Sequence, residues 1–218
     1  MRLYLSSYRL GESAGALLAL LGRSGRAAII SNALDDMPTA ARESYRRNVY
    51  DPIDEFAALG IGASQLDLRD YFAAPAHLAA ALADIDLVWV MGGNSFILRR
   101  AMLQSGFDRV LHQRLMADDI VYGGFSAGAV VATPSLRGIE LMDPPDIVPD
   151  GYDPDVPWDG LGLIDYAIVP HFASPHPEAQ AAAKLARHYA RAKTPFRALR
   201  DGEVIVQISQ LTDTREYA

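Results

Sequence analysis

The sequence lacks cysteine altogether. This absence excludes disulfide bonds, thiolate metal sites, iron–sulfur clusters and a cysteine nucleophile, so any covalent catalysis must use another side chain. It also fits a reducing compartment, and we expect a cytoplasmic protein. Long hydrophobic runs are missing too, because the apolar stretch Ala14–Leu21 is far shorter than the ~20 residues of a membrane span. Glycine and arginine follow this stretch where a secretory signal would carry small cleavage-site residues.

Positive charge is in deficit, with 20 Lys and Arg against 27 Asp and Glu and a net charge of −7. That sign disfavours phosphate backbones and anionic lipid, so we expect neither nucleic acid nor a membrane as a partner. The 218 residues, of which 50% are hydrophobic, fit one ordinary globular domain over 1–218. No repeat or linker divides the chain, and a homodimer stays open.

Short apolar runs alternate with longer segments of helical period, which predicts an α/β fold with a mostly parallel sheet covered by helices. The clearest buried strand is 86–91, and Pro52 must start, kink or divide the helical segment 39–59. The predicted strands are 3–5, 27–31, 65–68, 86–91, 120–122, 167–170, 196–199 and 204–208, the last two as a closing pair. The predicted helices are 12–21, 39–59, 75–82, 96–103, 107–117, 129–133 and 177–192.

A glycine-rich turn carries the strongest local signal for chemistry. The segment Gly123–Gly128 reads GGFSAG and contains G-x-S-x-G between a predicted strand and an apolar helical segment. This is the setting of a nucleophile elbow, in which glycines let strand and helix approach closely and expose the serine hydroxyl. Ser126 is therefore the candidate nucleophile. The alternative is a plain strand-to-helix turn with a capping serine.

A serine hydroxyl needs a base, and His171 is the best candidate for it. His171 follows a predicted strand at its carboxyl end, the edge of an open α/β sheet where catalytic groups collect. His176, just before Pro177, is the reserve candidate. The other three histidines fall in helical segments where we expect them on the surface, namely His77, His112 and His188.

A third group should orient the imidazole, and Asp201 also stands in a turn that follows a predicted strand. Two alternatives remain open. The first is that Asp201-Gly202 is only the turn of a hairpin. The second is that Glu203, close by in the same turn, is the true acid.

Backbone N–H groups that could stabilise an oxyanion are expected from Gly92 and Gly93 at the end of the best strand, with the amide of Ala127 as a second donor. The alternative for the two glycines is an anion-binding turn for a phosphate ligand, although no nucleotide-binding motif accompanies them. We expect no cofactor. We also expect no metal, since the histidines lack spacing such as H-E-x-x-H.

The stretch from Asp143 to Gly160 is rich in proline and aspartate and predicts a long surface loop over the site. Its carboxylates could bind a cation, but they lack the regular EF-hand spacing and its closing glutamate. Whether the loop closes as a lid is open.

Taken together, the motifs resemble those of peptidase E, the aspartyl dipeptidase family of serine peptidases that also includes the cyanophycinases. The resemblance implies a three-layer α/β/α sandwich related to class I glutamine amidotransferases. It further implies a peptidase acting on short peptides, with Ser126 as nucleophile, His171 as base and Asp201 as acid, in that chain order. The motifs that carry it are MGGNSF at 91–96, GFSAGA at 124–129, PHF at 170–172 and DG at 201–202.

The chain also departs from this family. Peptidase E generally has tryptophan before the nucleophile and asparagine four residues after it, where this chain has Phe125 and Val130, and its acid is usually glutamate. Segment 136–143 stands where the aspartyl dipeptidases have a polar segment after the nucleophile elbow. These changes leave the catalytic residues in place and bear on the substrate preference. We expect a dipeptidase that prefers an N-terminal aspartate, whose side chain would need a cationic or multiply donating partner. The candidates for substrate binding are Asn94, Arg99 and Arg137, with Arg100 beside them. The alternatives are another acyl hydrolase on the same scaffold, namely an esterase or a cyanophycinase-like hydrolase, and a non-catalytic binding module.

Overall fold

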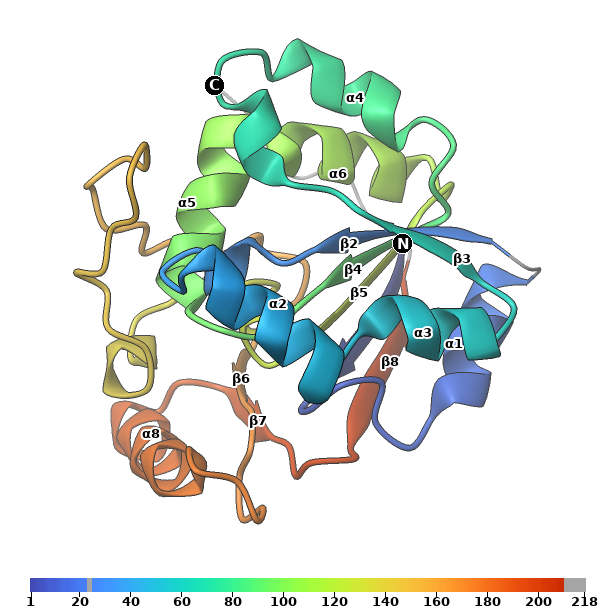
Figure 1. Cartoon of the computed structure of the whole chain (residues 1–218). Helices are drawn as coiled ribbons and strands as arrows, with labels where there is room; N and C mark the ends of the chain where they lie inside the picture. Colours follow the sequence, from blue (N-terminus) through green and yellow to red (C-terminus); the bar gives the residue numbers. More distant parts are fainter. Residues whose placement is uncertain (23–24, 210–218) are drawn as a thin grey trace.

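A six-stranded sheet lies at the centre of the computed structural model, which describes residues 1–22 and 25–209 (Figure 1). Its strands are β1 (Arg2–Ser6), β2 (Arg26–Ile30), β3 (Gly62–Gln65), β4 (Leu87–Val90), β5 (Val121–Phe125) and β8 (Val204–Ile208). The order is β3-β2-β4-β5-β1-β8, and every neighbouring pair is parallel except β1 with β8. The mostly parallel sheet confirms the α/β fold that the sequence predicts.

Helices cover both faces of the sheet (Figure 1). One face carries α1 (Ala14–Leu21), α2 (Thr39–Asn48) and α3 (Pro52–Ala58), and the other carries α4 (Ala76–Leu82), α5 (Ser95–Ser105) and α6 (Phe107–Met116). The remaining elements are the short helix α7 (Ala127–Val130), the helix α8 (Ala179–Ala192), the strands β6 (Ala167–Val169) and β7 (Phe196–Ala198), and the 3-10 turns η1 (Asn32–Leu34), η2 (Leu68–Tyr71) and η3 (Ile139–Leu141).

The central strands are hydrophobic on both sides because both faces are covered. In β4, Val88 and Val90 pack into the core beneath α5, while Leu87 and Trp89 pack with Phe56 of α3 in the opposite core. Side chains alternate along a strand, so a strand buried on both faces must be apolar at every position. This explains why segment 86–91 is the clearest strand signal in the sequence.

Local chemistry sets the boundaries that the sequence pattern leaves open. Pro52 divides the helical segment 39–59, because α2 ends at Asn48 and Pro52 begins α3. Asp51 caps α3 by accepting a hydrogen bond from the backbone N–H of Ile53 at 2.9 Å. The predicted strand 65–68 is placed too far along the chain, because β3 ends at Gln65 and Leu68 begins a 3-10 turn.

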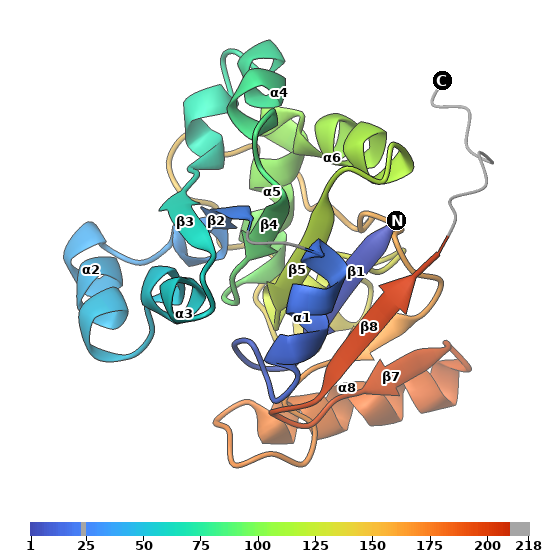
Figure 2. The ribbon, with the colours of Figure 1, turned by 90° about the vertical axis from the view of Figure 1, so that its right-hand side faces the viewer.

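The two closing strands are present where the sequence predicts them, but their predicted pairing with each other is wrong. β7 pairs in parallel with β6 in a separate two-stranded sheet, and β8 pairs with β1. The turn at Asp201 therefore joins two sheets and is not a hairpin. Figure 2 shows β7 and α8 at the end of the molecule where β1 ends and β8 begins.

The apolar stretch of residues 14–21 is helix α1, which buries Leu17, Leu20 and Leu21 against the sheet and ends at Gly22 with φ of 70°. Across residues 1–22 and 25–209, no helix combines the length and the apolar character that crossing a membrane requires.

The proline- and aspartate-rich loop from Asp143 to Gly160 lies beside α5 and is tied to it (Figure 1). Arg100 of α5 is 1% exposed, and its guanidinium donates to four loop carbonyls, those of Pro145, Ile147, Asp153 and Pro154. A buried cation needs such a complete set of acceptors, so Arg100 anchors the loop to α5. The loop itself lies at the surface, as the sequence predicts, and its aspartates after Asp143 are exposed.

Gly128 is where the sheet and α7 come closest, because a Cβ atom added there would lie 2.2 Å from the carbonyl oxygen of Val90. Replacing Gly128 by alanine should lower the free energy of unfolding by about 1–3 kcal/mol, as overpacking does. The measurement is the urea midpoint. Gly15→Ala in α1 is the matched control, since nothing lies within 4 Å of its added Cβ and it should be neutral or slightly stabilising. Equal midpoints for the two variants would contradict the expectation.

Candidate active site

Ser126 stands in a strained turn between β5 and α7. Its φ of 49° and ψ of −116° lie outside the regions that non-glycine residues prefer. The glycines on either side allow the turn, because a Cβ on Gly124 would lie 2.8 Å from the carbonyl carbon of Gly128. Helix and strand thus approach more closely than any side chain permits, as a nucleophile elbow requires.

The structure brings together the three residues that the sequence predicts as a catalytic triad. Nε2 of His171 lies 3.0 Å from Oγ of Ser126, and Nδ1 of His171 lies 2.8 Å from Oδ1 of Asp201. A carboxylate can only accept a hydrogen bond, so Nδ1 of His171 carries the proton and Nε2 is left to accept the hydrogen bond of the serine hydroxyl. This arrangement can withdraw a proton from Ser126 and hold the resulting imidazolium.

Parallel strand pairing explains why residues so distant in sequence converge. In the small sheet, Val169 of β6 stands opposite Ala198 of β7, so the chain segments that carry His171 and Asp201 leave the sheet side by side. The backbone N–H of Phe172 donates to the carbonyl of Leu199 at 2.9 Å, and that of Asp201 donates to Oγ of Ser174 at 2.7 Å. These bonds join the two turns.

Ser7 is a residue of the site that the sequence reasoning missed. It follows β1, where Ser6 pairs in register with Phe125, so it emerges next to the elbow. Its buried Oγ accepts a hydrogen bond from the backbone N–H of His171 at 2.8 Å and lies 2.9 Å from Oδ1 of Asp201. One hydroxyl therefore positions both triad partners. The available signal was its place after a strand at the same sheet edge.

The environment of His171 keeps its imidazole neutral. Burial lowers the pKa of His171 below 6.5, the hydrogen bond to Asp201 opposes this shift, and the neighbouring His176 reinforces it. A lowered pKa means that the ring is unprotonated at pH 7 and can accept a proton. Its backbone is strained as well, with φ of 59°.

Free backbone donors lie against Ser126. Gly92 is so near that a Cβ on it would lie 3.0 Å from Cβ of Ser126, and Gly93 has φ of 137° with no room for a side chain beside Ala33. Within residues 1–22 and 25–209, the N–H groups of Gly92, Gly93 and Ala127 donate to no protein acceptor. They are available to an oxyanion formed next to the serine.

Asn94 and Arg99, which the sequence offers as substrate-binding residues, are used inside the fold. Oδ1 of Asn94 caps α5 by accepting from the N–H groups of Phe96 and Ile97, and its Nδ2 donates to the carbonyl of Pro144. Arg99 is 3% exposed, makes two hydrogen bonds to the Asp108 carboxylate and donates from Nε to a loop carbonyl. The prediction is corrected for both, because their polar atoms already have internal partners.

Of the predicted arginines, Arg137 keeps an exposed guanidinium. It lies over the ring of Trp158, with its Cζ 5.0 Å from the ring centroid. Arg100 holds the loop, as described above. Arg137 is thus the remaining predicted candidate for contact with a substrate carboxylate.

The reserve candidates take other positions. The ring of His176 stacks on that of His171 with centroids 3.7 Å apart, and it makes no hydrogen bond to Ser126. Oε2 of Glu203 accepts from the backbone N–H of Arg200 at 2.7 Å and has no contact with His171. The carboxylate bonded to the imidazole is that of Asp201.

One cluster near the triad has residue types suited to a metal. His171, His176 and Glu178 each offer one ligand atom, and these atoms lie within 4.8 Å of one another. Two imidazoles and a carboxylate suit several transition metals. However, Nε2 of His171 already faces the Ser126 hydroxyl, so a metal on this nitrogen would compete with the proton transfer.

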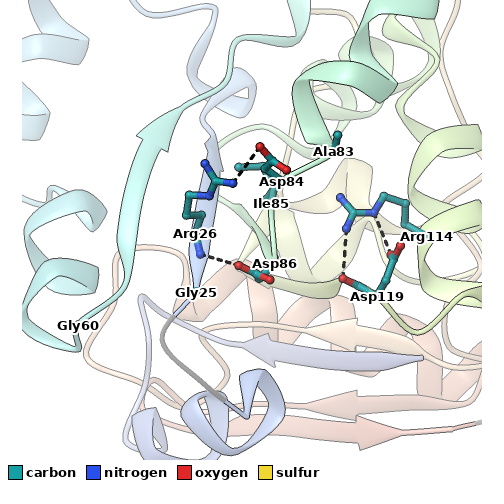
Figure 3. A pocket seen from close by; sticks show the side chains of 9 residues that line it. All are labelled: Gly25, Arg26, Gly60, Ala83, Asp84, Ile85, Asp86, Arg114 and Asp119. Carbon is teal, nitrogen blue, oxygen red and sulfur yellow. Dashed lines mark hydrogen bonds and ion pairs between the residues drawn. The ribbon is translucent and has the colours of Figure 1, made fainter.

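The opposite edge of the sheet carries a polar pocket with a different character (Figure 3). It is lined where β2, β4 and β5 begin, and its arginines face acidic partners: Arg26 lies 3.0 Å from Asp84, and Arg114 lies 2.9 Å from Asp119. Triad residues come from the carboxyl ends of strands, so this pocket is separate from the site.

Comparison with known proteins gives the same family as the motifs. The sequence profile of Peptidase family S51 matches residues 37–213. An uncharacterized peptidase of Pasteurella multocida is 30% identical over 154 residues, which are 70% of each chain. Peptidase E of Streptomyces coelicolor is 36% identical over 98 residues, 45% of this chain and 37% of that protein.

A solved structure supports the fold. The crystal structure of a peptidase E candidate from Listeria monocytogenes EGD-e matches with a TM-score of 0.69 and 20% identity, covering 94% of this chain and 97% of that one. The profile covers most of the chain, and the strand-end geometry of the site agrees with it. The chain therefore belongs to Peptidase family S51 and is a serine-type peptidase.

Proposed function

We propose that this peptidase hydrolyses short peptides by covalent catalysis at Ser126. The observation that carries the proposal is the continuous hydrogen-bonded series from Asp201 through His171 to Ser126, with bonds of 2.8 and 3.0 Å. A serine in a strained elbow beside an imidazole that is neutral at pH 7 has both requirements of a nucleophile, exposure and a base.

In this mechanism Oγ of Ser126 attacks the scissile carbonyl carbon while its proton moves to Nε2 of His171. The carbonyl oxygen becomes an oxyanion and accepts hydrogen bonds from the free N–H groups of Gly92, Gly93 and Ala127. Protonated His171 then gives its proton to the departing amine, and the C–N bond breaks. Water, deprotonated by His171, releases the acyl group and restores the serine hydroxyl.

We further propose that the substrates are dipeptides and that an N-terminal aspartate is preferred. The motifs shared with the aspartyl dipeptidases support this preference, and Arg137, the exposed arginine among the predicted substrate-binding residues, is the cation that we propose for the aspartate side chain. An esterase activity on the same site is the competing expectation, because ester and amide hydrolysis need the same groups.

Replacing Ser126 by alanine should reduce turnover by about 10⁴- to 10⁶-fold, because the nucleophile is lost while the hydroxyl has little part in packing. Turnover is measured on dipeptides, together with the labelling of the wild-type protein by a fluorophosphonate. Ser126→Ala should remain folded by circular dichroism and should not be labelled. Residual activity above a few per cent of the wild-type rate would contradict the mechanism.

Replacing Asp201 by asparagine should cut kcat by about 10⁴-fold, because an amide cannot stabilise the imidazolium and can favour the wrong tautomer. Glu203→Gln is the matched control and should stay within a few-fold of the wild type, since the Glu203 carboxylate accepts its hydrogen bond from the Arg200 backbone and not from His171. Steady-state kinetics on one dipeptide decides between them. The opposite ranking would transfer the acid role to Glu203.

Specificity is tested with Asp-Leu, Glu-Leu, Asn-Leu and Ala-Leu, alongside a simple ester. With an aspartyl preference carried by Arg137, Arg137→Ala should lower kcat/KM for Asp-Leu by about 10- to 100-fold more than for Ala-Leu. Arg109→Ala, another exposed arginine, should change neither. Equal wild-type rates on all four dipeptides would remove the aspartyl preference and leave a broader peptidase.

A further inference from the structure

Glu178 places a carboxylate at the reaction centre for which the triad has no use. It stands at the N-terminus of α8, and its Oε2 lies 3.8 Å from Nε2 of His171. Oγ of Ser126 lies 3.0 Å from the same nitrogen. The side chain is 45% exposed and therefore accessible from solvent.

Among the described residues, no lysine or arginine neutralises this carboxylate. Across the part of the chain that the structure describes, no lysine or arginine lies within 4.0 Å of Glu178, and its one ion-pair contact is His171, which is neutral at pH 7. Its neighbours are acidic: burial and the charge of Asp201 raise the pKa of Glu178, and its own charge helps burial raise the pKa of Asp143 to about 6. A partly buried carboxylate in a negative field favours a cationic ligand.

We infer that Glu178 binds the α-ammonium group of the substrate's N-terminal residue and so restricts the enzyme to peptides with a free N-terminus. This inference rests on the proposed function. When the first peptide bond is cleaved, the α-nitrogen and the attacked carbonyl carbon share one Cα, which places them about 2.5 Å apart. Only a group beside Ser126 and His171 can reach that ammonium, and within residues 1–22 and 25–209 Glu178 is a carboxylate there that has no lysine or arginine partner.

The surrounding residues hold Glu178 in place. Nδ1 of His176 accepts a hydrogen bond from the backbone N–H of Glu178 at 3.2 Å, and the His176 ring is stacked on His171. The His176 ring thus connects the backbone of Glu178 to the catalytic imidazole. A binding group that is held in position before the substrate arrives loses less conformational freedom on binding. His176 is a positioning residue in this arrangement.

The inference also limits where an aspartate side chain could bind. Glu178, Asp143 and Asp201 make one side of the site negative, so a second carboxylate on the substrate must point away from them toward a cation. An endopeptidase would have no use for such an ammonium subsite. A subsite for the ammonium group therefore distinguishes a dipeptidase or aminopeptidase from a general peptidase.

The test compares alanine p-nitroanilide with its N-acetyl derivative, and Ala-Leu with N-acetyl-Ala-Leu, in the wild type, Glu178→Gln and Glu178→Asp. We expect the wild type to prefer the free amine by at least 10-fold. Glu178→Gln should lower kcat/KM for the free amine by about 10- to 100-fold and change the acetylated substrate by less than about 3-fold. Glu178→Asp should recover part of the loss. Glu43→Gln, an exposed glutamate of α2, is the matched control.

Fluorophosphonate labelling separates this inference from the proposed function, because the probe has no ammonium group. Glu178→Gln should be labelled at the wild-type rate, which would also show that the variant is folded. Wild-type cleavage of acetylated and free substrates at equal rates, or an equal loss on both in Glu178→Gln, would overturn the role of Glu178. Absence of labelling and of turnover in the wild type would instead overturn the proposed function, and this inference with it.

Discussion

The close contact between β4, β5 and α7 is the constraint on which the rest of the site depends. Gly124 and Gly128 let α7 begin directly above the strands, and there is no space for even one methyl group between Gly128 and Val90. The chain can make this reversal only with Ser126 in a left-handed conformation, which costs about 1–3 kcal/mol. The same backbone geometry aims the hydroxyl outward and leaves the amide of Ala127 free, so one steric condition supplies both nucleophile and oxyanion donor.

His171 is a second residue with a strained backbone, and its conformation is held by contacts other than those of Ser126. Its backbone N–H bonds to Ser7 and its ring to Asp201, while the parallel register of β6 with β7 fixes the two turns beside each other. Strain at a functional site persists only when neighbouring structure determines the conformation in several ways. The small sheet and Ser7 fulfil that requirement here, which explains why the fold keeps a two-stranded sheet outside the main one.

Sequence reasoning found Ser126, His171 and Asp201 because each follows a strand, and the carboxyl ends of parallel strands gather at one edge. It failed for Arg99 and Asn94 because a sequence does not show which acceptor a side chain meets in three dimensions. Asp108, whose carboxylate accepts hydrogen bonds from Arg99, lies nine positions away on the next helix, and no local sequence pattern marks the pair. Pairing of β7 with β6 was missed for a related reason, since strand partners are set by tertiary packing rather than by adjacency.

The carboxylates around His171 differ in their partners, and the partners decide their roles. Asp201 is held by the imidazole and by Ser7, whereas Asp143 accepts from the backbone N–H of Ser95 and ties the loop to α5. Glu178 alone among the three faces the ligand side without a donor from the protein in the described chain. Its charge repels that of Asp201, and a positive charge that arrives with the substrate would offset this repulsion. Two carboxylates then have different roles on the two sides of one imidazole. Asp201 lies at Nδ1 of His171 and orients the ring, whereas Glu178 lies near Nε2 and recognises the N-terminus of the substrate.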